Sequence, residues 1–226
     1  MARLVLWDID HTLISTRGVG RELSAAAFER TTGIPMREQA AIDGITEPVI
    51  FRETAKLHGL TTDRAEFERF AQALAEEHLA HSAELRERGH ALPGATGALD
   101  ALASAGVTQT VVTGNIRSAG EIKLSVFGLD RHIVWSIGAY GEDAEDRADL
   151  VRLSLERAGC PAADAVLIGD TPADIAGGGA NGVRIVAVAT GRSGKSVLRS
   201  AGADAVLPDL RSLDVFLEAV LPNRDR

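Results

Sequence analysis

Two pairs of aspartates give this sequence its clearest chemical signal. Asp8 and Asp10 directly follow the apolar run at residues 3–7, and Asp170 ends a second apolar run, with Asp174 four residues later. Because Asp8 and Asp10 are two residues apart, extended geometry sends both carboxylates to the same side of the backbone. Asp174 would face back toward the opening that Asp170 marks. Carboxylates brought together repel, so such a site needs a cation or a shared proton to neutralise it.

A third strand end carries groups that suit an anion. Thr113, Gly114 and Asn115 follow an apolar, β-branched run. A threonine hydroxyl and the next backbone N–H groups can donate to phosphate oxygens, and Gly114 lets a ligand approach the backbone closely. Each of the three strand ends also has a purely structural interpretation: a solvated turn, a strand-to-turn cap, or a helix N-cap with an acid favoured by the helix dipole.

A sheet of parallel strands would position these side chains. From residue 91 onward, apolar runs alternate with segments of helical spacing, which predicts an α/β fold with a doubly wound parallel sheet covered by helices on both faces. In such sheets the active site lies beyond the carboxyl ends of the strands, where the polar residues fall. After the strand at 3–7, strands are predicted at 108–113, 132–137, 165–170 and 184–189, and helices at 95–105, 117–127, 147–158, 172–180, near 196 and at 209–220.

Residues 15–90 have a different pattern, with helical spacing and no convincing strand. Helices are predicted at 21–30, at 47–58 and from Thr62 or Asp63 to about residue 87, the last with an apolar stripe that includes Phe67, Phe70 and Leu74. The pattern predicts a small helical domain at 15–90, inserted into a discontinuous core of residues 1–14 and 91–226.

Composition excludes several classes of protein. With 45% hydrophobic and 25% charged residues the chain has ordinary globular composition, and a net charge of -8 offers no basic surface for nucleic acid. The single cysteine, Cys160, excludes an internal disulfide and fits a reducing compartment. No signal-peptide pattern is present, and no apolar run approaches the ~20 residues of a membrane span. We therefore expect a cytoplasmic protein without membrane or nucleic-acid partners, with monomer and homodimer both open.

The motifs together resemble those of the haloacid dehalogenase-like (HAD) superfamily, including its phosphoglycolate phosphatase-like members. The first motif corresponds to residues 8–13, Asp-Ile-Asp-His-Thr-Leu; the second to Thr113 at a strand end; the fourth to residues 169–174, Gly-Asp-Thr-Pro-Ala-Asp. The resemblance covers nearly the whole chain. It implies a Rossmann-like HAD core, with residues 15–90 as a helical cap domain of the family's C1 type.

The resemblance implies a Mg²⁺-dependent phosphatase that works through a covalent aspartyl-phosphate. Asp8 would be the nucleophile, and Asp10 the general acid and then the base. Mg²⁺ would be bound by Asp8, the backbone carbonyl of Asp10, and Asp170, with Asp174 supporting it directly or through water. The substrate would be a small phosphorylated metabolite, because a carboxylate at position 10 favours phosphate esters over halides.

Thr113, the amides of Gly114 and Asn115, and a basic side chain would bind the phosphate oxygens. For the basic residue the sequence departs from the family, which usually has a lysine: no lysine lies between Lys123 and the fourth motif. Arg147 is the best positional match, since arginine can bind two phosphate oxygens and stays charged. Lys123 is the alternative, and a surface ion pair would be a structural explanation for Arg147.

Substrate choice would lie with the cap. Residues 43–46 look like the family's substrate-specificity loop, so Gly44 and Thr46 are predicted to bind substrate. Arg17 and Arg52 are candidates for a second anionic group, as in a phosphoglycolate-like acid, although solvated arginines explain them equally well. Two other functions stay open: a sugar-phosphate mutase, which shares all four motifs, and an inactive HAD-like binding module.

Two further patterns have less specific explanations. Residues 189–196, Ala-Thr-Gly-Arg-Ser-Gly-Lys-Ser, resemble a phosphate-binding P-loop but lack its first glycine, and a glycine-rich strand-to-helix turn is the preferred interpretation. His78 and His81, three residues apart on a predicted helix, could bind a metal. A solvated helix face is the preferred interpretation of that pair.

Overall fold

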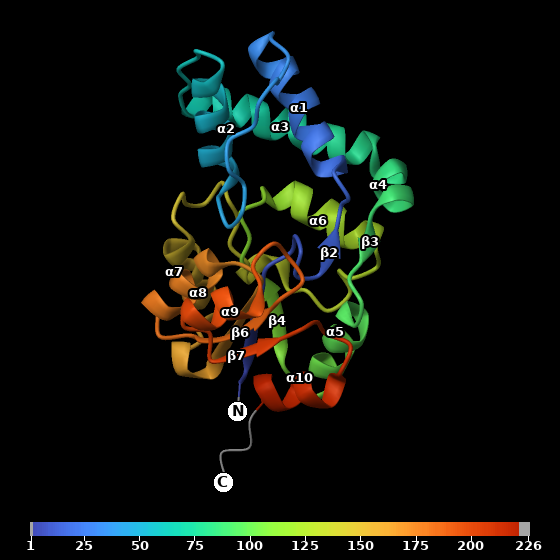
Figure 1. Ribbon diagram of the computed structural model, residues 1–226, viewed down its shortest axis with the longest axis vertical. Coiled ribbons are helices and arrows are strands. Elements are labelled where there is room, and N and C mark those ends of the chain that lie inside the picture. The colour runs from blue at the N-terminus through green and yellow to red at the C-terminus, as the bar shows by residue number, and fades with distance from the viewer. Residues whose placement is uncertain (1, 222–226) are drawn as a thin grey trace.

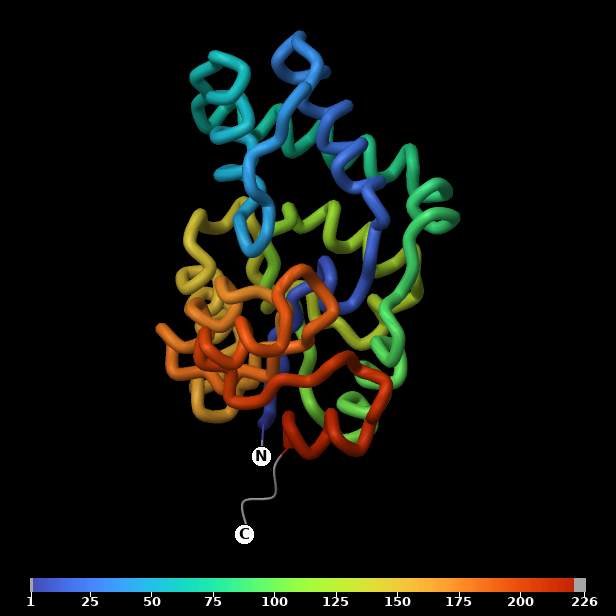
Figure 2. The backbone as a smooth tube through the Cα atoms, viewed as in Figure 1, coloured from blue at the N-terminus to red at the C-terminus, as the bar shows by residue number. Residues whose placement is uncertain are grey.

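The computed structural model describes residues 2–221 and has a five-stranded parallel sheet at its centre (Figures 1 and 2). The strand order is β4-β1-β5-β6-β7, and every neighbouring pair is parallel. This arrangement confirms the predicted α/β fold with a doubly wound parallel sheet. The strands are β1 (Leu4–Trp7), β4 (Thr108–Val111), β5 (Ala165–Gly169), β6 (Arg184–Val188) and β7 (Ala205–Leu207).

The central strand β1 is buried on both faces. Val5 and Trp7 pack into an apolar cluster with helices α5 (Ala95–Ser104) and α10 (Leu213–Val220), where Trp7 stacks on Phe216 with 5.9 Å between ring centroids. Leu4 and Leu6 pack on the opposite face against α7 (Arg147–Ala158). Because both faces are covered, the strand reads in the sequence as a continuous apolar run. The remaining helices of this part are α6 (Arg117–Val126), α8 (Pro172–Ala180) and α9 (Lys195–Ser200).

Four helices form a layer beyond the carboxyl ends of the strands, at the top of Figure 1. Its interior contains the buried rings of Phe28, Phe51, Phe67 and Phe70, of which Phe51 and Phe70 stack at 4.5 Å. Helix α6 closes this interior from the side of the sheet through Ala119. The four helices are α1 (Val19–Thr32), α2 (Glu47–Leu57), α3 (Arg64–Ala80) and α4 (Ser82–Arg88).

The two connections between the layer and the sheet run side by side. They form the short antiparallel strands β2 (Ile14–Ser15) and β3 (His90–Ala91), which pair Ile14 with Ala91 and Ser15 with His90. Sequence patterns do not predict these strands, because a run of two residues has no periodicity to detect.

The helix predicted from residue 62 or 63 to about 87 is two helices. Asp63 caps α3: its carboxylate accepts from the Glu66 N–H (2.8 Å), and the Glu66 carboxylate accepts from the Asp63 N–H (2.9 Å). His81 ends α3 and begins α4, so the chain turns where a continuous helix was expected. None of the helices described between residues 2 and 221 combines the length and the apolar character that spanning a membrane requires.

The strand predicted at 132–137 is wrong. Ile133 and Ala139 form isolated bridges beside β4, but Trp135–Ile137 is a 3-10 turn. The Tyr140 hydroxyl donates to the first carbonyl of that turn (2.6 Å), and the Thr110 hydroxyl donates to the carbonyl just before it (2.8 Å). Side chains therefore occupy carbonyls that a strand ladder would need, and the segment follows the sheet edge without extending it.

Candidate active site

A cavity opens between the carboxyl ends of the strands and the helical layer. Asp8 follows β1, Thr113 lies two residues beyond β4, and Asp170 follows β5, so the three predicted strand ends meet in this cavity. Gly44 and His78 line it from the helical layer. The location agrees with the general rule that parallel sheets place their sites beyond the carboxyl ends of the strands.

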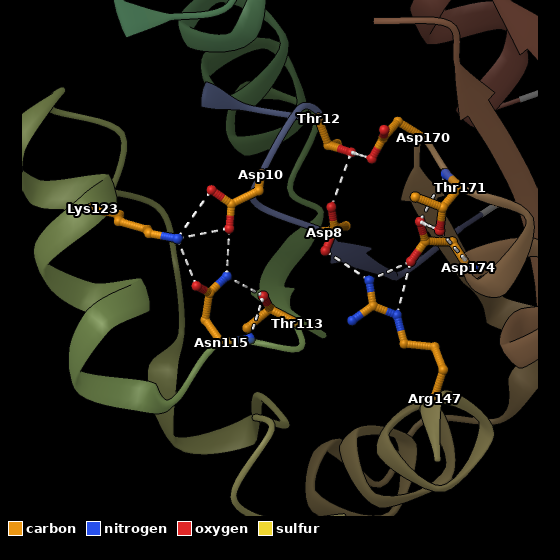
Figure 3. A network of polar contacts seen from close by, with 10 residues as sticks. All are labelled: Asp8, Asp10, Thr12, Thr113, Asn115, Lys123, Arg147, Asp170, Thr171 and Asp174. Atoms are coloured by element: carbon orange, nitrogen blue, oxygen red, sulfur yellow. Dashed lines mark hydrogen bonds and ion pairs between the residues drawn. The ribbon is translucent and has the colours of Figure 1, made fainter. Parts of the chain in front are cut away.

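Arg147 joins two carboxylates on one side of the cavity (Figure 3). Its Nη2 donates to Asp8 Oδ1 (2.7 Å) and its Nε to Asp174 Oδ1 (2.8 Å), to which Nη2 also donates. All three side chains are buried. Within residues 2–221, Nη1 of Arg147 has no hydrogen-bond partner, and in Figure 3 it points away from Asp174. A buried cation thus keeps donors available for an anion.

The acidic group around Arg147 holds more negative charge than Arg147 balances. Oxygen atoms of Asp8, Asp170 and Asp174 lie within 4.8 Å of one another. Burial and the charges of Asp8 and Asp174 raise the pKa of Asp170 to about 9. Burial and the charge of Asp174 also raise the pKa of Asp8, although Arg147 opposes them. Three buried carboxylates around one guanidinium are a donor set that fits a hard divalent cation.

The oxygens of Asp174 are already occupied. Oδ1 accepts from Arg147, and Oδ2 accepts from the backbone N–H (3.0 Å) and the hydroxyl (2.7 Å) of Thr171. The Thr12 hydroxyl lies 3.3 Å from both Asp8 Oδ2 and Asp170 Oδ1, and it has a single hydrogen to donate. Asp8 and Asp170 therefore keep more capacity for a metal than Asp174, which orients Arg147.

Lys123 and Asn115 hold Asp10 on the other side of the cavity. The Lys123 Nζ lies 3.0 Å from Asp10 Oδ1 and 2.8 Å from Oδ2, and it donates to Asn115 Oδ1 (2.6 Å). Asn115 Nδ2 donates to Asp10 Oδ2 (2.7 Å) and to the Thr113 hydroxyl oxygen (2.8 Å). Burial raises the pKa of Asp10, but the charge and hydrogen bonds of Lys123 and the hydrogen bond from Asn115 outweigh it and hold the pKa below its ordinary value.

The structure brings both candidate basic residues to the cavity, whereas sequence reasoning treated them as alternatives for one position. Arg147 contacts Asp8, and Lys123 contacts Asp10. The signal for Lys123 was its place on helix α6, where it shares the buried face with Ala119 and Leu124. A lysine buried on the apolar face of a helix needs an acidic partner.

The loop before α2 lies against two strand ends. Gly44 lines the cavity and packs on Thr171. The Glu47 N–H donates to the Gly114 carbonyl (2.9 Å), and a Cβ on Gly114 would lie 2.3 Å from the Ile45 carbonyl oxygen, so only glycine fits at 114. Thr46 was predicted to bind substrate, but within residues 2–221 it is not among the residues that line the cavity. Its hydroxyl donates to the Glu145 carbonyl (3.1 Å), which favours a role in fixing the loop.

The two arginines considered for a second anionic group do not line the cavity. Arg17 is exposed, and Arg52 forms an ion pair with Glu145 at 2.5 Å. A different arginine, Arg21 on α1, contributes to the cavity lining. No motif marks Arg21, since the orientation of α1 alone brings it there.

His78 is buried, which corrects the expectation of a solvated helix face; His81 is exposed as expected. The His78 side chain is 2% exposed and lines the cavity, with its Nδ1 2.9 Å from the Leu74 carbonyl oxygen. It lies four residues after Leu74, on the apolar stripe of α3, and this spacing is the signal that indicates burial. Glu47, the first residue of α2, also lines the cavity, and sequence reasoning treated it only as a helix start.

The P-loop-like segment is the turn between β6 and the six-residue helix α9, as the preferred interpretation held. It covers the acidic side of the site. The Thr190 hydroxyl donates to the His11 carbonyl (2.6 Å), and a Cβ on Gly191 would lie 1.7 Å from Asp170 Oδ2. Glycine at 191 is therefore required by the close approach of the backbone to Asp170.

Comparisons with known proteins agree on one family. Residues 5–188 match the family model of the haloacid dehalogenase-like hydrolases. Over 232 residues, the chain is 30% identical to a phosphoglycolate phosphatase from Rhodospirillum rubrum, an alignment that covers 100% of this chain and 95% of that one. A crystal structure of a hydrolase from Pseudomonas syringae has a TM-score of 0.71 at 20% identity and covers 96% of this chain and 98% of its own. A haloacid dehalogenase-like family hydrolase from Streptococcus pneumoniae has a TM-score of 0.65 at 14% identity, with coverages of 96% and 98%. These two structures establish likeness of fold.

Proposed function

This chain belongs to the haloacid dehalogenase-like hydrolases, and from that premise we propose that it is a Mg²⁺-dependent phosphatase that cleaves a small phosphate monoester through a covalent aspartyl-phosphate. One observation carries the proposal. The buried Asp8 lies 2.7 Å from the guanidinium of Arg147, whose Nη1 has no partner within the described part of the chain. A nucleophile beside an unoccupied donor is what phosphoryl transfer to a carboxylate requires.

Asp8 and Asp170 would hold the metal, with the backbone carbonyl of Asp10 as a further ligand. Asp174 would support this group, directly or through water, while its own oxygens orient Arg147. When bound, Mg²⁺ neutralises charge on the phosphoryl oxygens and allows Asp8 to stay ionised despite its raised pKa. The excess of buried negative charge in this group supports the assignment.

In the first step, an oxygen of Asp8 attacks phosphorus in line and the bond from phosphorus to the leaving oxygen breaks. Asp10 donates a proton to that oxygen, which departs as an alcohol. In the free protein Lys123 holds the pKa of Asp10 below its ordinary value. A bound phosphate adds negative charge and competes for the Lys123 ammonium, and both effects raise the pKa of Asp10 toward the value that an acid needs.

In the second step, Asp10 takes a proton from water, and the hydroxide oxygen attacks phosphorus and releases Asp8. Arg147 Nη1 and the Thr113 hydroxyl would bind the equatorial oxygens, together with the backbone amide of Gly114. The Thr113 oxygen accepts from the Asn115 N–H (3.2 Å) and from Asn115 Nδ2, which leaves its own hydrogen free for phosphate. The backbone N–H of Asn115, which was expected to bind phosphate, is thereby directed to Thr113 in the free protein.

We also propose that residues 15–90 act as a cap over a core of residues 1–14 and 91–226. The buried aromatic rings of the helical layer, which all come from residues 28–70, and its paired connections β2 and β3 support this division. Such a cap would close over substrate and exclude water from the aspartyl-phosphate. A cytoplasmic location is part of the same proposal and is in keeping with the single cysteine.

The substrate would be a small phosphorylated metabolite. The 30% identity to a phosphoglycolate phosphatase makes a phosphoglycolate-like acid one candidate. Neither Arg17 nor Arg52 lines the cavity, so in the described lining Arg21 is the arginine of the helical layer that would receive a carboxylate.

The test is phosphate release from p-nitrophenyl phosphate and a panel of small esters, with Mg²⁺ and with EDTA. Release that requires Mg²⁺ and disappears in Asp8→Asn, but persists in the exposed-site control Asp149→Asn, is the expected result. Isomerised sugar phosphate without free phosphate would instead identify a mutase. A folded protein that turns over no ester would identify a binding module and contradict the proposal.

A further inference from the structure

His78 lines the cavity and carries a hydrogen-bond acceptor whose position is fixed. Its Nδ1 lies 2.9 Å from the Leu74 carbonyl oxygen, and because a carbonyl can only accept, Nδ1 must carry the hydrogen. Burial and the nearby positive charge of Lys123 lower the pKa of His78 to about 4. The ring is therefore neutral at pH 7, and its Nε2 carries a lone pair and no hydrogen.

This Nε2 is buried without a partner. Among the described residues no donor reaches it, although the His78 side chain is only 2% exposed. A buried acceptor left unpaired is destabilising, so native proteins rarely keep one without a use. Because His78 lines the cavity, a molecule bound there can supply the missing donor.

His78 lies on the side of the cavity where the leaving group would depart. It lies on α3, which packs against α6, the helix that carries Lys123, and Lys123 and Asp10 form the ion pair opposite Arg147. In the mechanism proposed above, Asp10 protonates the leaving oxygen. The part of the substrate attached to that oxygen would therefore lie nearest to His78.

A second unpaired acceptor lies in the same region. Glu47 lines the cavity, and its carboxyl group has no hydrogen bond or ion pair within residues 2–221. Burial raises the pKa of Glu47 to about 7, with Lys123 lowering it and Asp10 raising it. The donors of Lys123 are already directed at Asp10 and Asn115. Above pH 7, where Glu47 is mostly ionised, this region therefore offers acceptors to a ligand, and a carboxylate placed here would repel Glu47 and find no donor at His78.

We propose that the site, taken as the phosphatase site described above, accepts a neutral leaving group that bears hydroxyls, as in a polyol or sugar phosphate, and that His78 Nε2 accepts a hydrogen bond from one of them. A polyol has one hydroxyl to donate to His78 and another to donate to an ionised Glu47, whereas the carboxylate of phosphoglycolate can donate to neither. A site built to pair with a hydroxyl rejects an analogue that lacks it, because the buried group is then left unpaired.

The first test compares kcat/KM for phosphoglycolate, p-nitrophenyl phosphate, and a set of glycerol, tetritol and hexose phosphates. The best hydroxylated ester should exceed phosphoglycolate by at least about tenfold. In His78→Leu, the ratio of that ester to p-nitrophenyl phosphate should fall by about tenfold or more, and His78→Gln should restore part of it because an amide oxygen also accepts. His81→Leu, an exposed histidine on the same helical segment, should leave the ratio unchanged.

A binding measurement keeps the inference separate from the proposed chemistry. Asp8→Asn with Mg²⁺ should bind the best hydroxylated ester more tightly than phosphoglycolate, by calorimetry, even without turnover. Nitrogen-15 spectra of the same protein should show His78 as the neutral Nδ1–H form, with its Nε2 signal shifted by that ester. Preference for phosphoglycolate, an unchanged ratio in His78→Leu, or a hydrogen on Nε2 would each overturn the inference. If the wild-type protein released no phosphate from p-nitrophenyl phosphate with Mg²⁺, while the binding results were as expected, the phosphatase proposal would be contradicted and this inference would not.

Discussion

The ammonium of Lys123 lies within 3.0 Å of both carboxylate oxygens of Asp10, so the residue proposed as the general acid is ion-paired in the free protein. The Lys123 side chain is buried, whereas that of Asp10 is about a third exposed. Breaking an ion pair that has one buried member costs more free energy of unfolding than breaking a pair whose members are both exposed.

Lys123→Met should therefore destabilise the protein by about 1–3 kcal/mol at pH 7, a value reduced for the exposure of Asp10. The pKa of Asp10 is lowered in the folded state. The contribution of the ionised carboxylate to the free energy of unfolding is therefore present above the ordinary pKa near 4 and is lost as pH falls through the lowered pKa. In urea unfolding, the difference in free energy of unfolding between the wild type and Lys123→Met should thus be smaller at pH 3 than at pH 7. Lys56→Met, in an exposed pair with Glu53, is the control and should cost under about 0.5 kcal/mol.

Stabilisation by Mg²⁺ should increase with pH. The pKa of Asp170 is raised to about 9 and that of Asp8 is raised as well. Their protonated forms therefore stabilise the metal-free fold below the ordinary pKa near 4, and this contribution is lost as pH rises toward about 9. Since a cation binds only the ionised carboxylates, the Tm increase with Mg²⁺ should be larger at pH 8.5 than at pH 5. Asp170→Asn should abolish the increase. An equal increase at both pH values would contradict the assignment of these aspartates as ligands.

Arg147→Lys tests whether the forked shape of arginine matters beyond its charge. Arg147 donates to Asp8 and Asp174 and still has Nη1 free, whereas a single ammonium cannot replace all three directions. We expect kcat/KM for p-nitrophenyl phosphate to fall at least about tenfold in Arg147→Lys and further in Arg147→Met. Arg152→Lys, an exposed change on the same helix, should have no effect. Wild-type activity in Arg147→Lys would show that charge alone is sufficient.

Measured at pH 8, where Glu47 is mostly ionised, Glu47→Gln should weaken the discrimination against carboxylate-bearing esters. The amide is neutral and has donors, so it removes the repulsion and can pair with a carboxylate. Relative to a glycerol phosphate, kcat/KM for phosphoglycolate should rise several-fold, by roughly 1 kcal/mol of transition-state free energy. The matched control is Glu53→Gln on the same helix, which is absent from the described cavity lining. If Glu47→Gln leaves the ratio at its wild-type value, Glu47 does not face the leaving group.

The residues that sequence reasoning placed well are those at strand ends. Asp8, Thr113 and Asp170 each follow a buried strand, and parallel pairing brings the ends of neighbouring strands together without further information. Arg147 was chosen as the best positional match to the family's basic residue, at the start of a predicted helix, and the structure places it beside Asp8. These are local patterns whose spatial result is fixed by the fold class.

The partners of Asp10 and the role of His78 depend on packing that no local pattern specifies. Lys123 reaches Asp10 across 113 residues of chain, and this contact depends on how α6 is rotated against the sheet. His78 lies on the same buried face of α3 as Phe70 and Leu74. A histidine is polar, so it does not count toward the apolar stripe by which a buried helix face is recognised in a sequence. The segment 132–137 has the composition of a strand, but side-chain hydrogen bonds at the sheet edge hold it in a turn.

The position of β1 at the centre of the sheet has a consequence for how the chain is made. β1 pairs with β4, with Leu4 beside Thr108, and with β5, with Leu4 beside Ala165. During translation it must wait for its partners, for a time on the order of ten seconds at ordinary rates of synthesis. The helical layer needs no such delay, because α1 packs on α3 and both are translated before β4. Ribosome-bound chains in which about the first 100 residues have left the exit tunnel should therefore hold α1 packed on α3 while the first strand is still unpaired; α6 then closes the layer, and the sheet is completed last.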